Sequence, residues 1–224
     1  RTSGRWDFII GVMVESLEKL NEVKKELIEE FGEDITNKTI SILVEAPHYY
    51  RNYLSEQKDY RVKYWVKREK EQKIDEMDLK ILRILANNSR TPIVEISEKV
   101  GANVKTIISR IKNLEKGGVI YDYRISLNLD KMGYTFYKCF ISLKSYNEVE
   151  YKKLLEYFKE HENIIHVVEC VGEWDLEPEF EIESFNKFQE TLREIRNKFS
   201  GIVKNIETIN ILQETSYTCL PEIK

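Results

Sequence analysis

The sequence predicts an α+β protein that combines a three-helix unit with ferredoxin-like domains of β-α-β-β-α-β order. Three observations lead to this fold class. The phrase G-x-W-D occurs twice, at residues 4–7 and 172–175, and each copy is followed by the pattern of a strand, a helix and a strand. Residues 136–173 add a strand, a helix and a strand in front of the second copy. Between the copies, residues 74–120 have the periodicity of three short helices.

The composition is that of a folded, soluble protein. Of the 224 residues, 42% are hydrophobic and 33% are charged, and the length suits about two domains. Neither a signal peptide nor a run of about 18 apolar residues is present, so no membrane-spanning segment is expected. The three cysteines, Cys139, Cys170 and Cys219, are widely spaced without a C-x-x-C pair. Reduced thiols in a cytoplasmic protein without metal or cofactor are therefore expected.

The net charge of −4 is unevenly distributed along the chain. Residues 58–73 hold seven basic and three acidic side chains, whereas residues 138–224 hold 11 basic and 17 acidic ones. If the protein meets a polyanion, this distribution favours contact through the middle of the chain.

Residues 1–50 are predicted to form the back half of a first ferredoxin-like domain. Residues 8–14 alternate with apolar side chains on both faces, as in a strand that is covered on both sides. Ser16 is placed as the N-cap of a helix over residues 17–31, and residues 39–43 form the next strand. Because no front half precedes this copy, we infer that an N-terminal part of the native protein lies upstream.

Residues 51–73 are predicted to be a basic, tyrosine-rich linker. Tyrosine, tryptophan and basic side chains alternate along this segment. The pattern favours a linker that packs on its neighbours, although such a segment could also lie along the phosphates of a nucleic acid.

Residues 74–123 are predicted to form a winged helix-turn-helix. The first helix has an apolar face, which consists of Ile74, Leu79, Leu82 and Leu85. We expect Thr91 to cap the second helix, with Pro92 at its first position. Gly101 makes the turn, and Asn103 caps the third helix, which ends at a Gly-Gly pair. This spacing is typical of a unit that reads DNA.

The third helix has two different faces. Its core face holds Ile107, Ile111 and Leu114 with Val104 beside them, and the opposite face holds Lys105, Ser109, Lys112 and Lys116. Lysines and Arg110 suit phosphates, whereas short hydroxyl and methyl groups suit base edges. The candidate DNA contacts are Asn103, Lys105, Thr106, Ile108, Ser109, Arg110 and Lys112. The alternative is an ordinary solvated helix in a small bundle.

After a connector over residues 124–135, residues 136–224 are predicted to form a complete ferredoxin-like domain. Its third strand has one face with Leu176, Pro178, Phe180 and Ile182 and another with Glu177, Glu179, Glu181 and Glu183. A central strand should resist Pro178, because proline cannot donate to the ladder. The glutamates need water or a basic partner, for which Lys138, Lys144 and residues 58–73 are candidates. We expect that two copies of this domain do not pack together through these glutamates.

The helix-turn-helix of residues 74–120, the strand-like residues 121–134 and the following domain with "GEWD" resemble the Lrp/AsnC family of feast/famine transcription regulators. The resemblance covers residues 74–218 as a complete unit and residues 4–50 as half of a second sensor domain, the RAM domain. It implies regulation of transcription, double-stranded DNA as partner, and a dimer or higher homo-oligomer built through the RAM sheet. The two RAM-like domains of this tandem form would take the place of two subunits, and a first DNA-binding unit would lie upstream.

The resemblance also implies a small effector, often an amino acid, at the G-x-x-D loop. The matching residues are Gly172, Trp174 and Asp175 in the second copy and Gly4 and Asp7 in the first. A glycine-containing turn that enters a central strand needs no ligand, however, so a purely structural loop is the alternative.

Two other functions are considered. A sensor or assembly module without DNA binding would have an acidic or buried third helix. An enzyme similar to the siroheme decarboxylases would need His and Arg side chains around a large pocket, and this half of the chain has only His161 and His166. His166 and Cys170 share a strand face, but two such residues do not make a metal site. We therefore expect no catalytic and no metal-binding residues.

Overall fold

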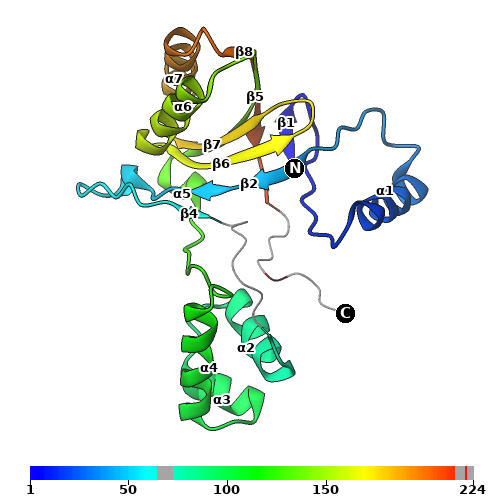
Figure 1. Cartoon of the computed structure of the whole chain (residues 1–224), viewed down its shortest axis with the longest axis vertical. Helices are drawn as coiled ribbons and strands as arrows, with labels where there is room; N and C mark the ends of the chain where they lie inside the picture. Colours follow the sequence, from blue (N-terminus) through cyan, green and yellow to red (C-terminus); the bar gives the residue numbers. More distant parts are fainter. Residues whose placement is uncertain (65–72, 215–219, 221–224) are drawn as a thin grey trace. The chain divides into compact units, whose positions relative to one another are not determined.

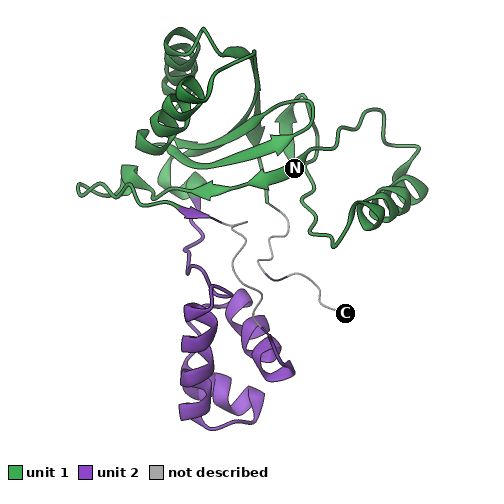
Figure 2. Ribbon diagram, viewed as in Figure 1, with its two compact units in different colours: residues 1–62, 129–214 green, residues 63–128, 215–224 purple. Residues whose placement is uncertain are grey.

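The structure, a computed structural model, describes residues 1–64, 73–214 and 220 of the chain. The chain divides into two compact units (Figure 2). The sheet unit contains residues 1–62 and 129–214, and the helical unit contains residues 63–128. Residues 1–50 and most of the predicted linker are thus grouped with the complete ferredoxin-like domain.

The complete domain has the predicted β-α-β-β-α-β order (Figure 1). Its elements are β5 (Thr135–Leu143), α6 (Glu148–Glu160), β6 (Ile164–Val171), β7 (Leu176–Ile182), α7 (Phe185–Lys198) and β8 (Val203–Ile211). The strand order is β8-β5-β7-β6, and all neighbours are antiparallel. The short helix α5 (Leu129–Met132) precedes β5. β7 is therefore central, as predicted.

Local sequence explains the two long helices of this domain. Asn147 and Ser184 are their N-caps, and each side chain accepts a hydrogen bond from the third residue of its helix. Both helices bury one apolar stripe in the main core. Fully buried members of that core include Leu154, Phe158, Phe180, Phe188 and Ile195.

Pro178 lies in the central strand, contrary to the expectation for a proline. It pairs in register with Val167 of β6. On the β5 side, the assigned partners pass from Lys138↔Glu179 directly to Ile141↔Leu176. The ladder is thus interrupted beside Pro178, where the missing N–H leaves no donor, and this interruption accommodates the proline.

The first copy is attached to both edges of this sheet. β1 (Thr2–Gly4) pairs with β8, and β2 (Ile42–Glu45) and β3 (Pro47–His48) pair with β6. The 3₁₀ helix η1 (Asn52–Leu54) follows. α1 (Leu17–Phe31) begins as predicted, because Ser16 accepts a hydrogen bond from the amide of Lys19.

The strand predicted over residues 8–14 is absent, and this prediction was wrong. The strand predicted at residues 39–43 begins only at Ile42. In the ferredoxin-like order the segment 8–14 would be a central strand between two neighbours. Residues 1–50 provide neither neighbour, so the backbone of residues 8–14 has no ladder to join. The expected cover on both faces is also missing, since Phe8 of one face and Ile9 of the other are both exposed.

The helical unit holds β4 (Lys63–Tyr64), α2 (Glu76–Asn87), α3 (Ile93–Val100) and α4 (Val104–Lys116). Its core is formed by Ile81, Leu82, Leu85, Ile96, Ile107, Ile111 and Leu114. Ile74, expected in this core, is exposed because it precedes the helix, and Ile81 takes its place. Thr91 does not cap α3: its hydroxyl donates to the carbonyl oxygen of Asn88, and Pro92 is the N-cap residue.

The segment that follows α4 is not a strand, although residues 121–134 were expected to form one. The amides of Val119 and Ile120 both donate to the carbonyl oxygen of Leu114, and the hydroxyl of Tyr123 donates to Glu115. This stretch therefore closes the end of α4 instead of pairing with a neighbour.

Cys139 and Cys170 are buried free thiols, whereas Cys219 and linker residues 65–72 lie outside the described residues. No helix in the described part of the chain is long and apolar enough to cross a membrane.

Candidate nucleic-acid interface

The start of α4 is determined by a turn residue, Gly101, and a cap residue, Asn103. Gly101 ends α3 in the left-handed region, at φ 75°. Two residues later, the side chain of Asn103 accepts a hydrogen bond from the amide of Thr106, at 2.9 Å. The cap uses the side-chain oxygen of Asn103, so this residue, which is itself exposed, positions the helix.

The outer face of α4 is exposed as the sequence predicted. Ile108 and Ser109 are exposed between the lysines Lys105 and Lys112, and Thr106 is partly exposed. None of the lysines of α4 forms an ion pair among the described residues. The lysines of the other two helices differ: Lys80 pairs with Glu76 and Lys99 with Glu95.

Arg110 was expected at a phosphate, but the structure gives it another role. Its guanidinium lies 2.5 Å from the carboxylate of Asp75 and 3.0 Å from that of Asp78. The hydrogen bonds that Arg110 donates to these carboxylates raise the pKa of Arg110. Both acids belong to the capping box of α2, so Arg110 ties α4 to the start of α2.

Thr106 and Ser109 lie beside the same acidic pair. Together with Asp75, Asp78 and Arg110 they line a hollow of about 480 Å³. The two hydroxyl groups expected at base edges are therefore on one side of α4, together with an arginine that is already neutralised.

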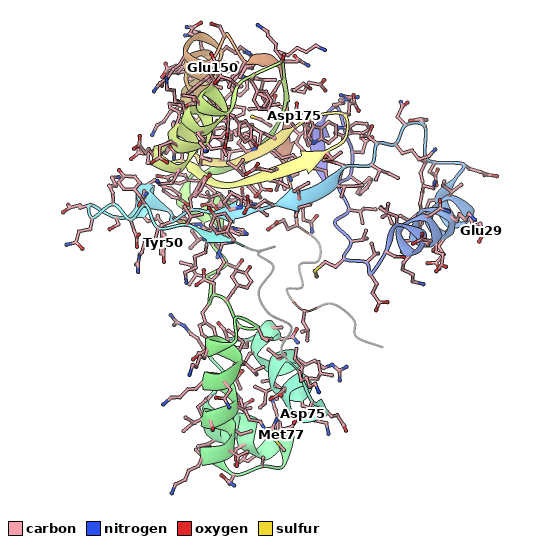
Figure 3. The ribbon with its side chains drawn as sticks, viewed as in Figure 1. Glu29, Tyr50, Asp75, Met77, Glu150 and Asp175 are labelled. Carbon is pink, nitrogen blue, oxygen red and sulfur yellow. The ribbon has the colours of Figure 1, made fainter. Side chains whose placement is uncertain are left out.

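The G-x-x-D loop of the second copy is held by contacts within the chain. The carboxylate of Asp175 accepts a hydrogen bond from the amide of Leu143, at 2.7 Å, where the β6–β7 hairpin turns (Figure 3). Trp174 is buried, and its indole N–H donates to Glu177 at 2.7 Å. A Cβ on Gly172 would lie 3.2 Å from the carbonyl oxygen of Ile40, so the backbone of the first copy approaches closely there.

The matching loop of the first copy is also engaged. Gly4 has φ 134°, and a Cβ there would lie 2.9 Å from the carbonyl oxygen of Thr208. The carbonyl oxygen of Asp7 accepts a hydrogen bond from the amide of Thr2, at 2.9 Å, whereas the side chain of Asp7 is exposed. Gly4 and Gly172 thus have packing reasons to be glycine.

The two G-x-W-D motifs contact one another. The ring centres of Trp6 and Trp174 are 6.5 Å apart. Arg5 pairs with Glu173 and, at 2.7 Å, with Glu207. The effector-binding candidates of both copies are therefore brought together at one place, although the sequence alone did not indicate that they meet.

Of the two alternatives for the glutamate face of β7, water or a basic partner, the structure shows a basic partner for most of it, and only Glu183 is exposed. Lys138 is buried and lies 2.7 Å from Glu177 and 3.1 Å from Glu179, as the sequence suggested. Burial alone would raise the pKa of Glu179, but Lys138 and His166 lower it below the usual value. Lys144 instead donates to the carbonyl oxygen of Ser200.

Residues 48–53 supply the remaining cover, which the sequence did not reveal. Two nitrogens of Arg51 lie 2.7 and 2.9 Å from the carboxylate of Glu181, which also accepts from the hydroxyl of Tyr53. The ring of His48 stacks on that of His166, with 3.8 Å between centres.

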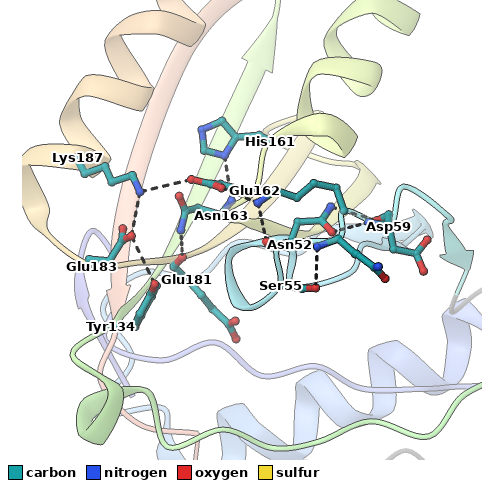
Figure 4. Close-up of polar contacts among 12 residues, drawn as sticks. Asn52, Ser55, Asp59, Tyr134, His161, Glu162, Asn163, Glu181, Glu183 and Lys187 are labelled. Atoms are coloured by element: carbon teal, nitrogen blue, oxygen red, sulfur yellow. Dashed lines mark hydrogen bonds and ion pairs between the residues drawn. The ribbon is translucent and has the colours of Figure 1, made fainter.

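Further polar contacts lie at the start of β6 and the end of β7 (Figure 4). Asn163 is buried and its side chain donates to the carbonyl oxygen of Glu181, at 2.7 Å. The basic side chains Lys58, Arg61 and Lys63 pair with Glu162, Asp59 and Asp122, and not with the β7 glutamates as suggested.

Comparison with known proteins agrees with this division into a helical unit and a sheet unit. Residues 74–121 match a family model described as winged helix-turn-helix, DNA-binding. An HTH-type transcriptional regulator of Pyrococcus furiosus is 35% identical over 147 residues, which are 64% of this chain and 88% of that protein.

Solved structures with a similar fold include two regulators. The transcriptional regulator NMB0573 of Neisseria meningitidis, solved as an L-Met complex, has a TM-score of 0.61 at 21% identity and covers 66% of this chain and 97% of its own. AsnC of E. coli has a TM-score of 0.52 at 25% identity and covers 65% of this chain and 97% of its own. With the helix-turn-helix, the ferredoxin-like domain and the relative from Pyrococcus furiosus, the chain belongs to the Lrp/AsnC family of transcriptional regulators.

Proposed function

We propose that this regulator binds double-stranded DNA through the outer face of α4. The observation that carries the proposal is the set of exposed lysines on α4, which lack a carboxylate partner among the described residues while Lys80 and Lys99 of the neighbouring helices have one. Unpaired cations in a row on one helix suit the phosphates of a duplex.

The residues of α4 divide into two roles under this proposal. Lys105 and Lys112 contact phosphates and supply affinity without sequence preference. Thr106, Ser109 and the methyl groups of Ile108 contact base edges in the major groove. Asn103 positions the N-terminus of the helix, and Arg110 is left out of the contacts because its charge is already paired.

Selection of bound sequences tests this division. The protein is mixed with genomic fragments, and the retained fragments are sequenced for the wild type, T106A and S109A. The proposal expects one recurring sequence for the wild type and a more degenerate one for each variant, with about 1–3 kcal/mol of discrimination lost per base contact. Identical recurring sequences in all three proteins would exclude Thr106 and Ser109 as readers.

An amino-acid effector is the second part of the proposal. The L-Met complex of the Neisseria regulator and the family resemblance of Gly172, Trp174, Asp175, Gly4 and Asp7 support it. In this chain the Asp175 carboxylate and the Trp174 indole already hold partners, so a ligand at this junction has to exchange contacts with them. Calorimetric titration with individual amino acids, on the wild type and on D7A, tests the site.

A dimer or larger homo-oligomer is the third part. Each chain offers one helix-turn-helix among its described residues, and proteins of this kind read two half-sites about one helical turn apart as dimers. Sedimentation of the free protein and of its DNA complex tests the stoichiometry, and one chain per bound site would contradict it. The proposed role is regulation in the cytoplasm and not catalysis.

A further inference from the structure

A buried chain of polar side chains crosses the glutamate face of β7. It begins at the indole N–H of Trp174, which donates to Oε1 of Glu177 at 2.7 Å. The other oxygen of Glu177 lies 2.7 Å from the amino group of Lys138, which also reaches Oε1 of Glu179 at 3.1 Å. The other oxygen of Glu179 lies 3.1 Å from Nδ1 of His166. Because each carboxylate joins two partners through its two oxygens, the chain is continuous from the G-x-W-D loop to β6.

The last member of this chain contacts the cover segment, residues 46–54. The ring of His48 stacks on that of His166, with 3.8 Å between centres and 6° between planes. The next amide, that of Tyr49, donates to the carbonyl oxygen of Ile165 at 2.9 Å. The cover segment is therefore fixed to β6 at the point where the buried chain ends, and the linker to the helix-turn-helix follows it along the sequence.

The members of the chain are buried, so the loss of one contact affects the next. Lys138 and His166 are 8% and 4% exposed. Burial alone would lower the pKa of Lys138, but Glu179 and Glu177 raise it above the ordinary value, so this lysine is charged at neutral pH. One lysine thus balances two carboxylates. A buried charge with an incomplete set of partners is unfavourable until water reaches it.

The two tryptophans of the repeated motif differ in their connection to this chain. Their ring centres are 6.5 Å apart. The indole nitrogen of Trp174 donates to Glu177, whereas that of Trp6 is buried and has no hydrogen-bond partner among the described residues. Only the second copy of the motif is therefore connected to the buried chain, and Trp6 provides a matched comparison.

We propose that the buried chain couples the Trp174 indole to the cover segment, so that the segment is closed while Trp174 donates to Glu177 and opens when this bond is broken. A ligand at the junction of the two G-x-W-D motifs breaks the bond if it accepts the indole N–H itself. This regulatory use rests on the proposed effector, whereas the coupling is a property of the ligand-free chain. The effector then acts on the residues that precede the linker to the helix-turn-helix.

The coupling follows from the shared lysine. Without the indole N–H, Glu177 depends more strongly on Lys138, and the lysine is drawn toward Glu177 and away from Glu179. Glu179 then keeps only His166 as a partner in a buried place, which favours states in which water reaches it. Displacement of the cover segment admits this water, because His48 lies directly on the ring of His166.

Hydrogen exchange of the Tyr49 amide in the full chain tests the coupling. W174F keeps an aromatic ring in the motif and removes the N–H that Glu177 accepts. We expect the Tyr49 amide to exchange about 10-fold faster in W174F than in the wild type, because the cover segment opens more often. W6F is the matched control, since it removes an indole N–H without a partner among the described residues, and exchange of Tyr49 should stay within about twofold of the wild type. The amide of Phe199, which closes the end of α7, should be unchanged in both variants.

A third variant tests the route of the coupling. E177Q keeps the size of the side chain and removes the charge that holds Lys138, so W174F should add less than about twofold to the exchange of Tyr49 in this background. Unchanged exchange of Tyr49 in W174F, or equal acceleration in W6F and W174F, would overturn the proposal. An effect of W174F that remains about 10-fold in the E177Q background would overturn the route through Lys138. No ligand is present in these measurements, so their outcome is separate from the titration that tests the proposed effector.

Discussion

Trp6 and Trp174 occupy the same position in the two G-x-W-D motifs, and the centres of their rings are 6.5 Å apart. The residue before each tryptophan adds an ion pair, between Arg5 and Glu173. The repeated phrase is therefore also a contact between its two copies. This contact and the strand pairs at both sheet edges explain why residues from the first copy form one compact unit with the second domain.

Replacement of Gly4 by alanine should loosen the N-terminal strand. The backbone at Gly4 has φ 134°, and the new Cβ would lie 2.9 Å from the carbonyl oxygen of Thr208. We expect a loss of about 1–3 kcal/mol in the free energy of unfolding, measured with urea. G11A is the control, since a Cβ on Gly11 meets no atom within 4 Å. Equal stability of G4A and G11A would show that the β1 contact is not formed in solution.

Replacement of Arg51 by alanine should leave a buried charge without its partner. The side chain of Glu181 is 4% exposed and receives two hydrogen bonds from Arg51. We expect a loss of about 3 kcal/mol in the free energy of unfolding, and faster proteolysis within residues 46–54. R61A is the control, because Arg61 pairs with Asp59 on the surface, and it should leave both quantities unchanged. Wild-type stability of R51A would mean that Glu181 is solvated.

Glu179 should make the stability of the sheet unit depend on pH. Burial alone would raise its pKa, but Lys138 and His166 lower it below the ordinary value of 4.5. A carboxylate with a lowered pKa stabilises the fold at pH values above its ordinary pKa. This stabilisation is lost as the pH falls through the folded-state pKa. We expect the urea midpoint of the wild type to fall below about pH 4.5. E179Q should be less stable at pH 7 and change less with pH, and equal pH slopes would contradict the ion pair.

The sequence predicted those features that depend on local patterns. Helix caps at Ser16 and Asn103, and the two faces of α4, need only neighbouring residues, and the structure has them, although the cap predicted at Thr91 is not formed. The order of the complete domain follows from periodicity and chain order in the same way. Residues 8–14 also had a strand pattern, but a strand needs neighbours, and periodicity does not reveal whether they exist.

The sequence did not predict most of the contacts between residues that are far apart along the chain. Arg51 and Glu181 are 130 positions apart, and neither has a local feature that indicates the other. Arg110 resembled a phosphate ligand because its place on α4 was known and the position of Asp75 was not. Charge and strand order suggested Lys138 as a partner of the β7 glutamates, but they did not suggest Arg51.

Arg110 and Lys112 should respond differently to replacement, although they are near neighbours on α4. R110A removes the bonds to Asp75 and Asp78, so it should lower the thermal midpoint of the helical unit. K112A removes an unpaired cation and should leave that midpoint unchanged. Circular dichroism during heating measures both. Equal midpoints for R110A and the wild type would show that the ion pairs of Arg110 do not stabilise the helical unit.

The exposed lysines of α4 are expected to contact DNA phosphates. The salt dependence of DNA affinity tests these contacts, and it is measured by fluorescence anisotropy for the wild type and K105A/K112A. The slope of log K against log salt should become less steep by about 0.9 for each lost contact, thus by about two in the double variant. K80A/K99A, whose lysines are paired with glutamates, should keep the wild-type slope. An unchanged slope in K105A/K112A would show that α4 does not contact the duplex.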